Sequence, residues 1–140
     1  MKLLNFELAN SRFPIELEGL EHSWDLHNLA EFVNLVFDPF ANTVVMEWFT
    51  GQDVRYSALK LLFGNVRRLE ISPRDEDLPP SEDYCLSYVA KVTSRSAKQD
   101  EPGRNQKSEE NNSFHLFFEL RSGRTIEIDS DTVELVAVLR

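Results

Sequence analysis

The residues best suited to catalysis in this sequence are His115 and Asp129, which lie in two neighbouring predicted strands near the end of the chain. A carboxylate beside a histidine orients the ring and stabilises the imidazolium, so such a pair suits the general base of a hydrolase. A base also needs a nucleophile or a substrate pocket, and the sequence indicates neither beside these residues. A charge pair between two strands on a solvated face explains the two side chains more simply.

A second pattern is typical of a site for a hard cation. Glu127, Asp129 and Asp131 alternate along one predicted strand, so their carboxylates would share one face. The glycine-containing calcium loop of an EF-hand is absent. His22 and His27 lack the spacing and the adjacent glutamate of a zinc-binding helix. Acids are also ordinary on a solvated strand face, and we therefore expect no metal and no other cofactor.

Cys85 is the only cysteine, so no internal disulfide is available to the chain. It follows Tyr84 and precedes Leu86 in a segment that should pack. Such a cysteine usually acts as a small buried hydrophobic residue, because a nucleophilic thiol needs a lowered pKa and a neighbouring base. The chain has neither a glycine-rich phosphate loop nor the Gly-x-Ser-x-Gly turn of a hydrolase. The sequence therefore favours a binding or accessory protein over an enzyme.

Acidic residues are concentrated in the first third of the chain. The net charge is −9, and residues 1–53 hold nine acids against Lys2 and Arg12, a net charge of −7. Nucleic-acid binding needs clustered Lys and Arg, so we expect no nucleic-acid partner. The imbalance favours docking of a basic protein, for which this chain would be an acidic inhibitor or an immunity-type partner. The simpler interpretation is that negative charge keeps a small protein soluble.

The chain is expected to form one soluble domain over residues 1–140. Asn5 and Glu7 interrupt the apolar run at the amino terminus, so we predict neither a signal peptide nor a membrane segment, and a cytoplasmic location. Residues 94–112 contain a single apolar side chain, Ala97. Such a segment cannot offset its ordering entropy by burial, and we predict a disordered loop.

Most of the remaining sequence alternates between apolar and polar residues with the period of a strand. We predict a mainly β fold, an antiparallel sandwich or an open barrel, with one or two short helices; α+β is the alternative. Residues 26–37 and 81–92 fit a strand or a helix, and the β-branched content of 26–37 favours a strand. Exposed strand edges would permit a homodimer. A β domain of this kind could also hold a small apolar ligand among its Phe side chains.

The closing hairpin allows a more specific prediction. Leu116 and Phe118 share one face of its first arm, while Ile126 and Ile128 share one face of the second. Directly paired residues point the same way, so burial of both faces requires Phe118 opposite Ile126 and Leu116 opposite Ile128. That register needs a three-residue turn at residues 121–123 with Gly123 in the left-handed position. The same register places Phe117 opposite Glu127, and it would place His115 opposite Asp129.

Overall fold

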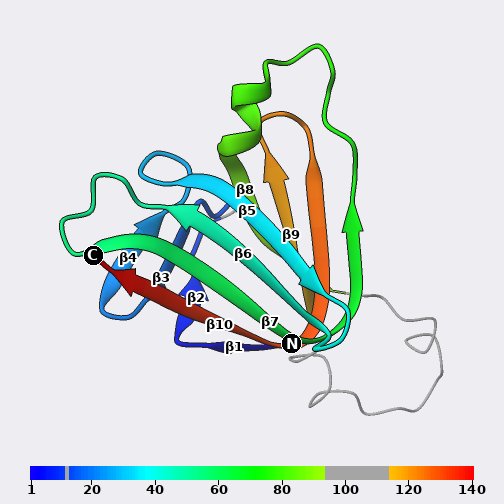
Figure 1. Cartoon of the computed structure of the whole chain (residues 1–140), viewed down its shortest axis with the longest axis horizontal. Helices are drawn as coiled ribbons and strands as arrows, with labels where there is room; N and C mark the ends of the chain where they lie inside the picture. The colour runs from blue at the N-terminus through cyan, green and yellow to red at the C-terminus, as the bar shows by residue number, and fades with distance from the viewer. Residues whose placement is uncertain (12, 94–113) are drawn as a thin grey trace.

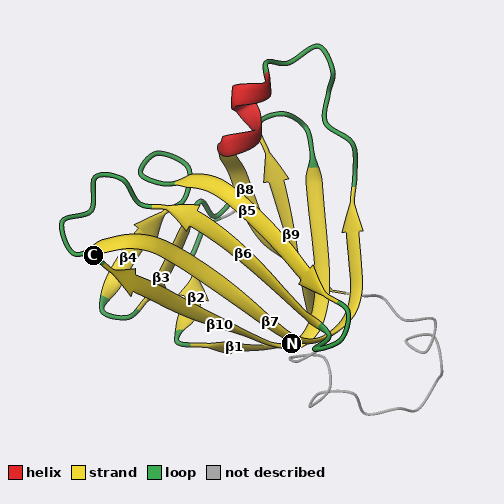
Figure 2. Cartoon of the chain, in the orientation of Figure 1, coloured by secondary structure: helices red, strands yellow, loops and turns green. Residues whose placement is uncertain are grey.

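A curved antiparallel sheet forms a half-barrel, and a small sheet lies beside it (Figures 1 and 2). The computed structural model describes residues 1–11, 13–93 and 114–140. The half-barrel has the strand order β5-β6-β7-β10-β9-β8, and β1 (Lys2–Leu4) pairs with β10 in parallel. Its strands are β5 (Glu31–Asp38), β6 (Thr43–Phe49), β7 (Tyr56–Ile71), β8 (Leu86–Thr93), β9 (Phe114–Leu120) and β10 (Thr125–Leu139). The mainly β prediction is confirmed, while the loop predicted at 94–112 lies outside the described residues.

The small sheet has the order β2-β3-β4, with β2 (Phe6–Leu8), β3 (Glu16–Gly19) and β4 (His22–Asp25). The chain passes from β1 to β2 through Asn5, whose φ of 71° lies in the left-handed region that Asn tolerates. Phe6, Leu17 and Trp24 are buried on the inner face of this sheet and join the apolar core. The small sheet therefore closes part of the half-barrel and presents its other face to solvent.

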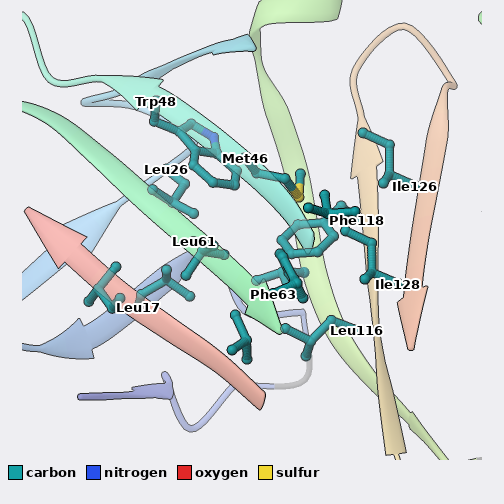
Figure 3. Packing of buried hydrophobic residues seen from close by; sticks show 14 of the residues in the cluster. Leu17, Leu26, Met46, Trp48, Leu61, Phe63, Leu116, Phe118, Ile126 and Ile128 are labelled. Atoms are coloured by element: carbon teal, nitrogen blue, oxygen red, sulfur yellow. The ribbon is translucent and has the colours of Figure 1, made fainter. Parts of the chain in front are cut away.

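Large apolar side chains from several strands fill the space between the two sheets (Figure 3). Trp48 of β6, Phe63 of β7 and Phe118 of β9 are each at most 1% exposed. The Phe118 ring lies 6.1 Å from the Trp48 ring and 6.4 Å from the Phe63 ring, measured between centroids. The aromatic residues that could have lined a cavity for an apolar ligand thus pack against one another.

The predicted register of the closing hairpin is confirmed. Phe118 pairs with Ile126, and Leu116 pairs with Ile128. The turn comprises residues 121–123, and the Leu120 N–H donates to the Arg124 carbonyl oxygen at 2.9 Å. Gly123 has a φ of 83°, the left-handed conformation that the three-residue turn requires. Burial of one face on each arm was therefore enough to determine this register.

The two ambiguous segments are mainly strand. Residues 31–38 form β5, and the Asp25 carboxylate caps a turn before it by accepting the N–H groups of His27 and Asn28. In the second segment a short 3₁₀ helix, η1 (Pro80–Tyr84), precedes β8. The described ranges contain no α-helix, and none of their helices has the length and apolar character needed to cross a membrane.

Candidate binding surface

His115 and Asp129 lie one residue beyond Leu116 and Ile128, the last described pair of the β9–β10 ladder, and each side chain has other partners. His115 is 7% exposed, and its Nε2 lies 3.5 Å from Glu127 Oε1 and 3.2 Å from Nη2 of Arg68. Asp129 binds Arg67 instead, at 3.0 Å. The sequence did not predict these partners, because β7, on the other side of β10, supplies the two arginines. A buried imidazole between a guanidinium and a carboxylate lacks access to a substrate, so this arrangement does not support catalysis.

The three alternating carboxylates do not form a cation site either. A β-bulge between Asp129 and Ser130 lets Arg67 of β7 bind both Asp129 and Asp131, while Glu127 turns toward Arg68 and His115. Hydrogen bonds from Asn65 and Arg67 lower the pKa of Asp131. The place of a metal ion is thus taken by a guanidinium. No cluster of three or more potential metal-ligating side chains occurs in the part of the chain that the structure describes.

Cys85 lies beside His27, a proximity that could not be predicted from the sequence. Its Sγ lies 3.6 Å from His27 Nδ1, and the thiol donates to the His27 carbonyl oxygen at 3.4 Å. The same Nδ1 lies 2.5 Å from the Leu86 carbonyl oxygen, which can only accept, so Nδ1 carries a proton. A protonated nitrogen cannot accept the thiol proton. Burial also raises the pKa of Cys85, and the pair is therefore unlike an activated cysteine nucleophile.

Alkylation should test this assignment of Cys85. We expect iodoacetamide to modify the folded protein more slowly at neutral pH than it modifies free cysteine, because the raised pKa reduces the thiolate fraction. The rate should rise with a midpoint above the ordinary value of 9.0. Folding favours the neutral Cys85 thiol, so this thiol stabilises the protein at any pH below its pKa in the unfolded chain. The stabilisation is lost as the pH rises through the pKa of Cys85 in the folded protein. Mass spectrometry over a pH series measures the rate, and fast labelling at neutral pH would show an activated thiol.

The outer face of the small sheet carries four carboxylates, which we call the acidic face: Glu7, Glu16, Glu18 and Asp25. They alternate with the buried residues of the same strands, as the period of a strand requires. Glu7 of β2 is directly opposite Glu18 of β3, and Glu16 of β3 is directly opposite Asp25 of β4. The sequence predicted an acidic first third, but only the strand register shows that its acids face one another.

Like charges directly opposite each other destabilise a sheet. Within residues 1–11, 13–93 and 114–140, no Lys or Arg forms an ion pair with the acidic face. Glu16 accepts a hydrogen bond from Ser23 at 3.1 Å, and Asp25 accepts one from the Asn28 side chain at 2.9 Å. Burial opposes ionisation of Asp25, but the hydrogen bonds from Asn28 and His27 prevail and lower its pKa. The acidic face therefore retains charge that nothing described on this sheet neutralises.

Two adjoining pockets, together called the groove, begin at the edge of the acidic face. The first, of about 300 Å³, is lined by Trp24, Asp25, Leu29 and Asp53 among others. The second, of about 420 Å³, shares Leu29 with it and continues to Glu31, Phe49, Tyr84 and Cys85. Leu29 is 63% exposed and Tyr84 52% exposed. Neither lining includes a Lys or Arg from the described residues, so the groove combines apolar surface with negative charge.

Comparisons of the chain with protein-family models, with curated proteins and with solved structures found no match in any of the three. A function must therefore be inferred from the surface itself. The acidic face and the groove lie next to each other and share Asp25. Together they form a surface suited to a positively charged partner with apolar side chains.

Proposed function

We propose that this protein is a small binding protein that docks a basic partner protein through its acidic face, as an inhibitor or an immunity-type protein would. The observation that supports it most is the direct opposition of Glu7 to Glu18 and of Glu16 to Asp25. Two such pairs in one small sheet lower its stability without serving its core. Natural proteins often give up stability where function needs it, so the cost is consistent with a binding role.

Charge complementarity explains what such a surface contributes. A negative face attracts a positive partner during diffusion and raises the rate of association, an effect that salt screens. The approach of Lys or Arg from the partner would relieve the repulsion within each pair of carboxylates. The adjacent groove supplies apolar contacts through Leu29 and Tyr84, which charge alone would lack. The combination favours a basic protein over a free cation, because a protein can occupy both surfaces at once.

Neutralising the two acids of β3 should separate binding from stability. We expect the double variant Glu16→Gln with Glu18→Gln to be more stable than the natural chain by roughly 0.2–1 kcal/mol for each relieved pair. The same variant should bind a basic partner more weakly, by roughly two- to tenfold, and with less dependence on salt. Urea unfolding measures the first effect. Affinity capture from a lysate of the source cells, eluted with increasing salt, measures the second.

A matched variant removes two acids that have no acid directly opposite. Glu47 of β6 is opposite Lys60 and Asn34, and Glu134 of β10 is opposite Leu62. Replacing both with Gln changes the net charge equally, yet should leave stability equal or lower and capture unchanged. If both variants lose the same proteins at the same salt, binding reflects net charge rather than the acidic face. If neither the immobilised natural chain nor the immobilised matched variant retains a basic protein that salt elutes, the proposed function is wrong.

A further inference from the structure

The two outer edges of the half-barrel, β8 and β5, differ in how they are protected against pairing with another strand. At the β8 edge, the Val89 N–H donates to the Pro14 carbonyl oxygen at 2.9 Å, and Lys91 places a charge on the strand. At the β5 edge, no described strand pairs with the side opposite β6. β5 contains neither Lys nor Arg. Proteins usually protect such edges with lysines, proline, a β-bulge or a covering segment. β5 has a bulge at Val33 and contacts η1, but no strand of the described residues covers the stretch from Asn34 to Asp38.

The side chains along β5 are those of a surface that another strand would cover. Val33 is 47% exposed, Val36 is 51% exposed and Phe37 is 45% exposed. A register shift after Phe32 leaves Val33 unpaired with β6, but the strand pairs regularly from Asn34 to Asp38. An apolar edge of this length is a template for an extended segment.

The ends of β5 indicate the charge of that segment. Glu31 and Asp38 mark the two ends of the strand, and both are exposed. At the Glu31 end the edge opens into the larger pocket of the groove, which η1 borders through Ser81 and Tyr84. Glu31 is the sole acid among the described residues of that pocket, and no Lys or Arg accompanies it. A basic side chain at the end of an added strand would therefore find a negative, partly apolar pocket.

We propose that the free edge of β5 receives an extended strand of a partner protein, with Lys or Arg at each end of that strand. A second copy of this chain fits less well. Two β5 strands paired antiparallel about their middle would set Glu31 of each copy against Asp38 of the other, and opposed like charges are unfavourable. Backbone hydrogen bonds supply affinity in this mode, and the charges at the ends supply selectivity. This strand site uses β5 and the larger pocket, so it overlaps the groove of the proposed function but does not include the acidic face.

A capped peptide that alternates Val and Thr between two terminal Lys residues, with the eight-residue length of β5, is a suitable probe. Amide NMR of the full chain should show saturable shifts at residues 31–38 and in the larger pocket. Methylation of the peptide nitrogens removes the donors of a strand ladder and should weaken binding more than tenfold. Glu replacing both Lys residues should also weaken it. On the protein, Glu31→Gln should weaken binding roughly two- to fivefold and Val36→Lys by more.

Two controls keep the outcomes distinct. Glu134 lies in β10, away from the β5 edge, so the Glu134→Gln variant should bind the peptide normally. The double variant Glu16→Gln with Glu18→Gln should also bind it normally. Loss of peptide binding in that double variant would assign the effect to the acidic face and overturn the proposal for β5. Equal binding of the methylated peptide, or an absence of shifts at residues 31–38, would overturn it as well. So would a dimer in sedimentation equilibrium that Val36→Lys dissociates, because the edge would then belong to a second copy.

Discussion

Replacing Phe118 with alanine is expected to lower the free energy of unfolding by about 3–5 kcal/mol, the usual cost of deleting a large aromatic side chain from a core. Phe118 is 0% exposed and contacts the rings of Trp48 and Phe63, which come from two other strands. Its loss would leave a cavity between the layers that rigid neighbouring strands cannot fill. Urea unfolding followed by tryptophan fluorescence gives the change, and an unchanged m value would show that the unfolded state is the same.

Phe40 provides the matched control, because it is 99% exposed in the turn between β5 and β6. Phe40→Ala should change stability by less than about 0.5 kcal/mol. If Phe118→Ala fails to fold, Phe118→Leu keeps most of the volume and should cost roughly 1–2 kcal/mol. Similar losses in Phe118→Ala and Phe40→Ala would contradict the placement of Phe118 in the core.

The closing hairpin could be predicted because its determinants are local. Phe118 and Ile126 had to face one core, and Gly123 stood at the only offset that allows this pairing with a three-residue turn. For His115 and Asp129, the hairpin register alone did not predict the side-chain partners. The hairpin register pointed to Asp129, but a third strand, β7, brought Arg67 and Arg68 to these residues. The sequence does not indicate which strand lies on the far side of β10. That strand, β7, supplies the arginines that contact His115 and Asp129.

The small sheet shows the same limit. Leu4, Phe6 and Leu8 alternate with Asn5 and Glu7 in the sequence, a pattern typical of one strand. Asn5 nevertheless has a φ of 71°, and the segments on either side of it belong to different sheets. Alternation reports which side chains are buried, and it does not report which strand they pair with. The acidity of the first third was evident from composition. The opposition of Glu7 to Glu18 required the pairing of β2 with β3, which only the structure supplies.

Replacing Gly19 with alanine is the second change expected to have a large effect. A Cβ atom at Gly19 would lie 2.0 Å from the carbonyl oxygen of Asn5 and 2.8 Å from Cα of Phe6. Both are backbone atoms, so the clash can be relieved only by moving β2 away from β3. Overpacking of a well-packed site costs about 1–3 kcal/mol, and a backbone obstacle places this variant at the upper end. Urea unfolding measures the loss, and hydrogen exchange should localise it to β2, β3 and β4.

Gly51 distinguishes this effect from the general cost of removing a glycine. A Cβ there would lie 2.7 Å from Cε1 of Phe49, a ring that is 45% exposed and can move, so Gly51→Ala should change stability by less than about 0.5 kcal/mol. Because β2 and β3 carry three of the four carboxylates of the acidic face, Gly19→Ala should also abolish salt-dependent capture of a basic partner. Normal capture by a chain whose small sheet has lost its exchange protection would mean that the partner binds elsewhere, and the edge of β5 would then be the surface to test first.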